Sequence, residues 1–105
     1  MKEITPTELK ALIDSGADFQ LIDVREPHEI EIATIGGENI PLGSIMQNTD
    51  KISEEKQVII YCRSGGRSGQ AVAALEQYLE QDNLYNLKGG ILRYADDVDS
   101  SLQKY

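Results

Sequence analysis

The chain has 105 residues, the size of one ordinary domain, and we expect a single unit over residues 1–105. Hydrophobic residues make up 40% of it and charged residues 27%, a balance typical of globular rather than disordered proteins. The 18 acidic and 10 basic residues give a formal net charge of -8, which argues against binding to nucleic acid or to an anionic membrane surface.

The cysteine and histidine counts limit the chemistry further. With one cysteine and one histidine, the chain has no internal disulfide and no metal site built from these residue types, so we expect no metal and no cofactor. No apolar run approaches the ~20 residues that cross a bilayer. Residues 1–6 lack the apolar core of a signal peptide. We therefore expect a cytoplasmic protein whose lone thiol is kept reduced.

Helical and strand patterns alternate along the first half of the chain. Thr5 and Glu8 form a capping box around Pro6, which predicts a helix start, and Gly16 marks the end of that helix. After it we predict a strand over residues 19–24, a second short helix that begins at Glu26–Pro27 and is broken by Gly36–Gly37, a turn over residues 40–43, and one short helix within residues 44–56.

The second half of the chain continues the alternation. Residues 58–61 form a continuous β-branched run that ends in a tyrosine, typical of a strand covered on both faces in a parallel sheet. A loop over residues 62–66 then leads into the best helical pattern, residues 68–81. A strand over residues 84–87, a helix over residues 91–98 and a tail over residues 100–105 complete the chain. The alternation predicts an α/β fold with a mostly parallel central sheet.

One loop carries the residue types of covalent catalysis. Cys62 follows the predicted buried strand, at the sheet edge where open α/β proteins bind their ligands. Gly65 and Gly66 tolerate positive φ, so the backbone can turn successive N–H groups inward to form an anion-binding nest. The helix that begins near Arg67 or Ser68 points its positive end at the same place. Both features favour a thiolate at Cys62, and the thiolate is the nucleophilic form.

The charges near the cysteine are opposite in sign to the net charge of the whole chain. Between Lys56 and Leu75 there are three basic residues, Lys56, Arg63 and Arg67, and no acidic one, so the pocket should attract a small anion. The competing interpretation, a buried and inert cysteine, leaves the Gly-Gly-Arg sequence after Cys62 unexplained. A phosphate-binding P-loop would need a Gly-Lys-Ser/Thr that is absent, and thioredoxin-like exchange would need a second cysteine.

Other polar residues have both a structural and a functional interpretation. Asp23 and Arg25, at the end of the first predicted strand, either support the pocket or form a structural ion pair, and we favour the ion pair. His28 is expected to face solvent rather than to act as a general base. The acidic residues around it, Glu26, Glu29 and Glu31, are expected to form a solvated face. Four tyrosines are expected to pack with a wet hydroxyl: Tyr61, Tyr78, Tyr85 and Tyr94.

Four stretches of the sequence match one family in content and in order: Asp23–Pro27, Asn39–Leu42, Tyr61–Ser68 and Leu87–Ile91. Together they resemble a single-domain rhodanese, a sulfurtransferase, and they cover nearly the whole chain. Residues 89–105 are most similar to rhodanese domains attached to the activating enzymes of molybdopterin and thiamine synthesis. The resemblance implies a rhodanese-like fold with helices on both faces of the sheet.

The resemblance also implies an activity like that of thiosulfate sulfurtransferases. Cys62 would attack a small anionic sulfur donor such as thiosulfate and become a persulfide. Cyanide, a thiol or a sulfur-carrier protein would then accept the sulfur. Substrate binding would fall on the residues that follow the cysteine, whose amides would hold the sulfur and whose arginines would attract the donor: Arg63, Ser64, Gly65, Gly66, Arg67 and Ser68.

Two other functions stay open on the sequence alone. One is a rhodanese-like binding or regulatory module without catalysis, which would not need the intact Cys62 loop and its two arginines. The other is a small cysteine-based phosphatase or arsenate-type reductase. Such phosphatases have one residue more between cysteine and arginine than the four, Arg63 to Gly66, found here. The shorter loop suits a single sulfur atom better than a phosphate.

Overall fold

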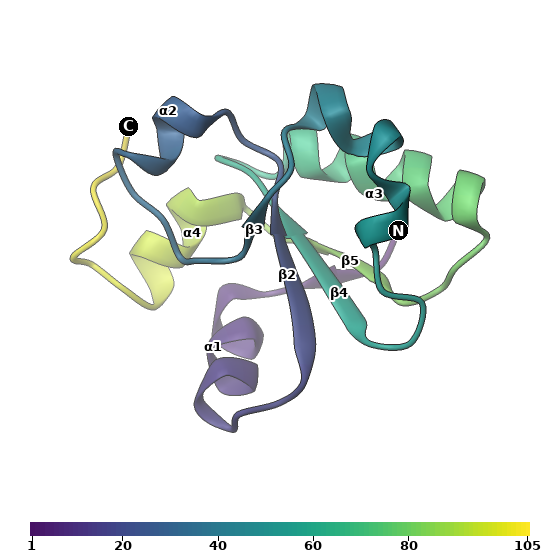
Figure 1. Ribbon diagram of the computed structural model, residues 1–105. Coiled ribbons are helices and arrows are strands. Elements are labelled where there is room, and N and C mark those ends of the chain that lie inside the picture. The colour runs from purple at the N-terminus through teal and green to yellow at the C-terminus, as the bar shows by residue number, and fades with distance from the viewer.

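A computed structural model describes all of residues 1–105, and a sheet of five parallel strands forms its centre (Figure 1). The strands are β1 (Glu3–Ile4), β2 (Phe19–Asp23), β3 (Glu38–Asn39), β4 (Gln57–Tyr61) and β5 (Leu84–Leu87). They stand in the order β1-β5-β4-β2-β3, and every neighbouring pair is parallel. The predicted α/β fold with a parallel sheet is confirmed.

Helices cover both faces of the sheet, as the resemblance implied. On one side lie α1 (Pro6–Asp14) and α4 (Gly90–Asp97), and on the other lies α3 (Gly66–Leu79) with the 3-10 helix η1 (Leu42–Gln47) (Figure 1). The remaining helices are short: α2 (Pro27–Ile30) and η2 (Thr49–Lys51). The capping box that predicted the start of α1 is present, since Thr5 and Glu8 exchange hydrogen bonds of 2.9 and 3.2 Å.

The side chains of β4 divide the core between the two faces of the sheet. Ile60 belongs to a cluster of 12 buried residues on the side of α3 and η1. Ile59 and Tyr61 belong to a cluster of eight on the side of α1 and α4. Residues 58–61 are all 0% exposed, because both faces of this central strand are covered. This explains the continuous apolar run that predicted a buried parallel strand.

The register of the strands brings their carboxyl ends to one edge of the sheet. Asp23 of β2 pairs with Tyr61 of β4, and Ile60 pairs with Asn86 of β5. Cys62 therefore lies directly after β4, between the residues that follow β2 and the last residues of β5. This is the edge at which open parallel sheets bind ligands.

The structure differs from the predictions mainly at short elements. The helix after the cysteine begins at Gly66 rather than Ser68 and ends at Leu79, and α2 ends at Ile30, before the glycine pair. The helix predicted within residues 44–56 is replaced by η1 and η2. The strands β1 and β3 have two residues each, too few to show an alternating pattern. None of the helices has the length and apolar character needed to cross a membrane.

Candidate active site

Cys62 is held where the chain passes from β4 into α3, in the Cys62 loop (residues 62–66). Gly65 has φ 104, a left-handed conformation that glycine adopts without strain, and α3 begins at the next residue. Gly66 has no positive φ, so Gly65 alone uses the conformational freedom that the sequence offered at both glycines. Cys62 is 1% exposed and contacts the core cluster on the α3 side.

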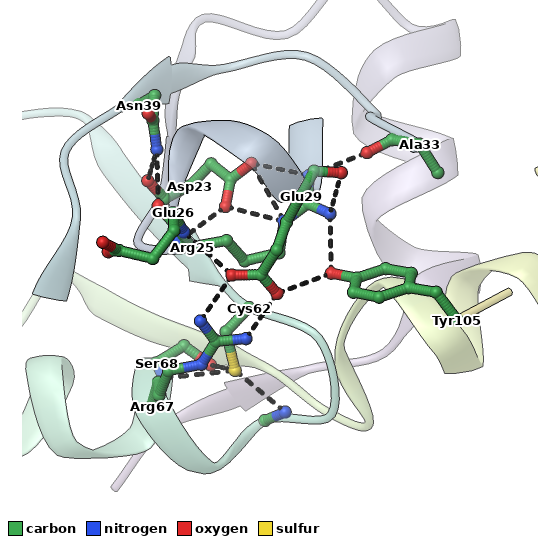
Figure 2. A network of polar contacts seen from close by, with 11 residues as sticks. Asp23, Arg25, Glu26, Glu29, Ala33, Asn39, Cys62, Arg67, Ser68 and Tyr105 are labelled. Carbon is green, nitrogen blue, oxygen red and sulfur yellow. Dashed lines mark hydrogen bonds and ion pairs between the residues drawn. The ribbon is translucent and has the colours of Figure 1, made fainter. Parts of the chain in front are cut away.

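Three hydrogen-bond donors surround the sulfur of Cys62 (Figure 2). The N–H of Gly65 lies 3.1 Å from Sγ, the N–H of Ser68 3.4 Å, and the hydroxyl of Ser68 3.3 Å. Burial raises the pKa of the thiol, but hydrogen bonds from Ser68, Gly65 and Ser64 outweigh burial and leave the pKa below its ordinary value. The loop therefore favours the thiolate, as its glycines and the helix start predicted.

The first turn of α4 orients the Cys62 loop. The N–H of Ile91 donates to the carbonyl of Cys62 at 2.9 Å, and the N–H of Leu92 donates to the carbonyl of Arg63 at 3.1 Å. Amides in the first turn of a helix have no partner within that helix, so they are free to make such contacts. Because peptide groups are trans, carbonyls directed at α4 turn the next N–H groups, including that of Ser64, toward the sulfur side.

Gly90 allows α4 to approach the loop this closely. It has φ +64, and a Cβ here would lie 2.7 Å from the carbonyl oxygen of Cys62 and would overlap that of Arg63. Glycine is therefore required at residue 90 both for its backbone conformation and for space. The sequence indicated only that the Gly89–Gly90 pair turns the chain into a helix, whereas the structure places the pair against the nucleophile.

Arg67 faces Glu29 across the site (Figure 2). Its terminal nitrogens donate to the two carboxylate oxygens at 2.7 and 2.8 Å, a bidentate ion pair. The hydrogen bonds from Arg67 lower the pKa of Glu29, and those from the Glu26 amide and the Tyr105 hydroxyl lower it further. They outweigh burial, which raises the pKa, and bring it to about 2. The expected solvated face of Glu26, Glu29 and Glu31 is wrong for Glu29. It is 6% exposed, because it closes the α2 capping box and turns inward.

Arg25 is 0% exposed, and protein groups accept all five of its N–H donors. Nε and one Nη2 hydrogen contact the carboxylate of Asp23 at 3.0 and 2.8 Å, and the other Nη2 hydrogen contacts the Ala33 carbonyl at 2.9 Å. Nη1 donates to the Tyr105 hydroxyl at 2.8 Å and to the Glu29 carbonyl at 3.4 Å. With no donor left for a substrate, Asp23 and Arg25 have the geometry of a structural brace.

Residues 100–105, predicted only as a tail, return to the site. The Tyr105 hydroxyl accepts from Arg25 and donates to Glu29 at 2.9 Å (Figure 2). The guanidinium of Arg63, which is otherwise exposed, donates to the Tyr105 carbonyl and lies 5.1 Å from the centre of its ring. No sequence pattern indicated Tyr105, because a contact between residues 25 and 105 leaves no local signal in the chain.

Ser68 is fully buried beside the sulfur, and it is held by a residue that no sequence motif indicated. The amide oxygen of Asn86, in β5, lies 2.5 Å from the Ser68 hydroxyl. The amide nitrogen of Asn86 donates to the Gly65 carbonyl at 3.2 Å. Asn86 is 5% exposed. The signal that could have found it is a lone carboxamide in a short strand whose neighbours on both sides are apolar or aromatic.

Among the other predicted residues, Ser64 contributes its backbone N–H to the Cys62 sulfur but no side-chain hydrogen bond. Ser64 is exposed, and His28 is exposed on α2 as expected. The wet hydroxyl predicted for Tyr61 is wrong, since the residue is 0% exposed and its hydroxyl donates to the Gly36 carbonyl at 2.7 Å. Tyr78 is 66% exposed rather than packed. No group of three or more His, Cys, Asp or Glu side chains is placed to hold a metal ion.

Both the sequence and the fold match those of known proteins. The family model for the rhodanese-like domain matches residues 5–97. The chain belongs to the rhodanese family. Among its relatives, a sulfurtransferase of Allochromatium vinosum is 35% identical and is matched over 90% of this chain and 89% of its own length.

Other relatives and solved structures agree with this assignment. The probable adenylyltransferase/sulfurtransferase MoeZ of Mycobacterium tuberculosis is 33% identical over 97% of this chain, which spans about a quarter (26%) of MoeZ. A Staphylococcus saprophyticus crystal structure has a TM-score of 0.81 at 36% identity and covers 93% of this chain and 97% of its own. A rhodanese-like domain protein of Staphylococcus aureus has a TM-score of 0.82 at 27% identity and covers 100% and 99%.

Proposed function

We propose that this rhodanese is a sulfurtransferase in which Cys62 carries a sulfane sulfur from a small anionic donor such as thiosulfate to a thiophilic acceptor. The observation that carries this proposal is the ring of donors around the sulfur, at 3.1 to 3.4 Å, which stabilises a negative charge there. An inert core cysteine has no use for such a ring. The relative from Allochromatium vinosum, named a sulfurtransferase, supports the same activity.

The cycle has two displacement steps and needs no oxidant. The Cys62 thiolate attacks the sulfane sulfur of thiosulfate, a new S–S bond forms, and the electron pair of the broken S–S bond leaves with sulfite. The outer sulfur of the resulting persulfide carries the negative charge. A nucleophile such as cyanide then attacks the outer sulfur, takes it as thiocyanate, and returns the bonding pair to Cys62 as thiolate. Each step therefore balances in atoms and charge.

The access to the sulfur favours a donor with a terminal sulfur atom. Cys62 is 1% exposed, so a donor reaches it best through a single protruding atom, as in thiosulfate. Phosphatase chemistry is disfavoured by the state of Arg67. A phosphate that approached the loop would compete with the bidentate Glu29 carboxylate for the same guanidinium, at contacts of 2.7 and 2.8 Å.

The acceptor and the compartment belong to the same proposal. MoeZ, to part of which this chain is similar, is named as both an adenylyltransferase and a sulfurtransferase, which supports a sulfur-carrier protein as one acceptor beside cyanide or a small thiol. Since the chemistry requires a free thiol, we place the protein in the reducing cytoplasm.

Intact mass spectrometry tests the proposal directly. After incubation with thiosulfate and removal of the excess, the protein should gain about 32 Da, one sulfur atom, and a reductant or cyanide should remove it. Cys62→Ser is the matched control, because it replaces sulfur by oxygen at a buried position and removes the nucleophile. It should stay folded by circular dichroism, gain no mass and produce no thiocyanate.

The rival functions give different results in the same experiment. A binding module without chemistry gains no mass even though Cys62 is present. A phosphatase gains no sulfur but releases phosphate from a small aryl phosphate, in a reaction that Cys62→Ser abolishes. Thiocyanate production that survives in Cys62→Ser would show that the covalent mechanism is wrong.

A further inference from the structure

The hydroxyl of Ser68 has one proton and two acceptors. Its oxygen lies 2.5 Å from the amide oxygen of Asn86 and 3.3 Å from the sulfur of Cys62. A serine hydroxyl donates a single hydrogen bond, so it cannot serve both acceptors at once. Both residues are withdrawn from bulk solvent, since Ser68 is 0% exposed and Asn86 is 5% exposed. The direction of this one proton therefore depends on the charge of the sulfur.

The orientation of the Asn86 carboxamide is fixed by a second contact. Its nitrogen donates to the Gly65 carbonyl at 3.2 Å, which leaves the oxygen directed at Ser68. If the carboxamide were reversed, its NH2 group would face the Ser68 hydroxyl and its oxygen would face the Gly65 carbonyl. That carbonyl would then have no donor from Asn86. The backbone holds the residue as well, since Asn86 pairs in register with Ile60, two residues before the cysteine.

We propose that the Ser68 hydroxyl is a two-position donor shared between Cys62 and Asn86, and that Asn86 is a positioning residue which limits how far this hydroxyl stabilises anionic sulfur. With a neutral thiol, the hydroxyl donates to Asn86 and its oxygen accepts from the S–H of Cys62. With a thiolate, the hydroxyl turns to the sulfur, and the buried amide oxygen of Asn86 loses its partner. That loss opposes ionisation, because an unpartnered buried acceptor is unfavourable.

This switch of the Ser68 hydroxyl between Asn86 and Cys62 affects each step of the sulfur-transfer cycle, and this part of the inference rests on the proposed function. The attacking thiolate draws the proton of Ser68. When the new S–S bond forms, the negative charge moves to the outer sulfur, and the Ser68 proton is free to return to Asn86. Asn86 thus favours the neutral inner sulfur of the persulfide over the free thiolate.

The charged groups near the sulfur do not change in this test. The strand β5 that carries Asn86 contains no charged side chain. The other elements at the site contribute Arg63 from the Cys62 loop, Arg67 from α3, Glu29 from α2, the Asp23–Arg25 pair at the end of β2, and Arg93 on α4, which is paired with Asp97. Substitutions at residues 68 and 86 leave all of these charges in place. A change in the midpoint of Cys62 ionisation therefore reports the loss or redirection of the Ser68 hydrogen bond.

The test is the sign of the change in Cys62 ionisation. The thiolate is followed against pH by its ultraviolet absorbance, with the matching Cys62→Ser variant subtracted, and by the rate of alkylation with iodoacetamide. Ser68→Ala removes the donor and should raise the midpoint. Asn86→Leu, similar in shape, removes the competing acceptor and should lower the midpoint by about half a pH unit, a roughly threefold change in ionisation constant. In Ser68→Ala the second substitution should have no effect.

A purely structural Asn86 predicts the opposite sign. If Asn86 only braced Gly65, its loss would loosen the loop and raise the midpoint, as Ser68→Ala does. A raised or unchanged midpoint in a folded Asn86→Leu variant therefore overturns the proposal. Asn83→Leu is the matched control, the same substitution just before β5 and bonded to residues 53 and 56 instead of the site. It should leave the midpoint unchanged.

Two further measurements keep the proposal testable if Asn86→Leu does not fold. Asn86→Ala removes the same acceptor without adding volume, and the same lowered midpoint is expected. In the unaltered chain, the carboxamide carbon resonance of Asn86 should titrate with the midpoint of Cys62 and should be constant in Cys62→Ser. An Asn86 resonance that does not change as Cys62 ionises would overturn the proposal. None of these readouts requires sulfur transfer, so a failed mass experiment refutes the function while leaving the switch intact, and the reverse also holds.

Discussion

Glu29 is the residue at which the charges of the site meet. Its carboxylate accepts two hydrogen bonds from Arg67, one from the Glu26 amide and one from the Tyr105 hydroxyl. Arg67 therefore shares its charge with a carboxylate before any donor molecule arrives. Its first role is to tie the start of α3 to α2, and the attraction of anions falls more heavily on Arg63 at the exposed rim.

Glu29→Gln tests this pair through the pH dependence of stability. The pKa of Glu29 is lowered from 4.5 to about 2 in the folded protein. A lowered pKa means that the carboxylate contributes stability above the unfolded value of 4.5, and the contribution is lost as pH falls toward 2. We expect Glu29→Gln to lower the free energy of unfolding by about 1 to 2 kcal/mol at neutral pH, as for other charged hydrogen bonds.

Denaturant unfolding from neutral to acid pH measures this effect. The gap between the unaltered chain and Glu29→Gln should shrink below pH 4.5. Glu31→Gln, at an exposed residue directly after α2, should show no such gap. A gap of constant size at every pH would mean that the Glu29 charge is not what stabilises the protein.

At the scale of elements, the contact between α4 and the Cys62 loop decides the orientation of the site. The amides of Ile91 and Leu92 hold the carbonyls of Cys62 and Arg63, and this requires α4 to begin against the loop at Gly90. The nest around the sulfur is therefore shaped by two helix starts. α3 supplies the Ser68 amide and hydroxyl, and α4 fixes the direction of the peptide groups.

Gly90→Ala should damage the site through this contact. The methyl group would overlap the carbonyl of Arg63 and force α4 away, so we expect a loss of about 2 kcal/mol or more of stability, from strain and overpacking together. The pKa of Cys62 should rise as its donors shift. The measurements are thermal unfolding and the pH dependence of Cys62 alkylation.

Gly16→Ala separates the overlap from the backbone strain. Gly16 has φ +68, close to the φ +64 of Gly90, but a Cβ there would meet nothing within 4 Å. It should cost about 1 kcal/mol and leave Cys62 unchanged. Equal effects of the two substitutions on Cys62 reactivity would contradict the proposed role of α4.

Over the whole molecule, the site is assembled from segments far apart in the chain. Tyr105 is the most distant of them, and it links Arg63, Glu29 and Arg25. Tyr105→Phe removes only the hydroxyl, which leaves one donor of the buried Arg25 guanidinium without its acceptor. We expect a loss of about 1 kcal/mol in the free energy of unfolding. Tyr85→Phe, a similarly half-buried tyrosine, is the control.

Denaturant unfolding of the two variants decides the point. Tyr85 has its ring near Lys2 and no bond to the site, so Tyr85→Phe should change stability little. Equal stability of Tyr105→Phe and the unaltered chain would show that the hydroxyl contributes nothing to the network, and that the last residues lie against the site without supporting it.

The features that could be predicted from the sequence are those that depend on residues close together in the chain. The capping box at Thr5, the β-branched run of β4 and the glycines after Cys62 each act within a few residues, so the fold class, most helices and the thiolate loop follow from them. Asn86, Tyr105 and the inward turn of Glu29 depend on segments that meet only in the folded chain. A carboxylate on a short polar helix looks solvated until the position of the arginine opposite it is known.

The hold of α4 on the Cys62 loop also determines when the thiol becomes reactive. A ribosome releases the chain from its amino end, so Cys62 emerges well before Asn86, Ile91 and Leu92. Until α4 docks, the carbonyls of Cys62 and Arg63 have no helix to orient them, and the peptide groups of the Cys62 loop are not held in the arrangement that surrounds the sulfur. The geometry that lowers the pKa of Cys62 is therefore complete only once β5 and α4 have been made and have docked.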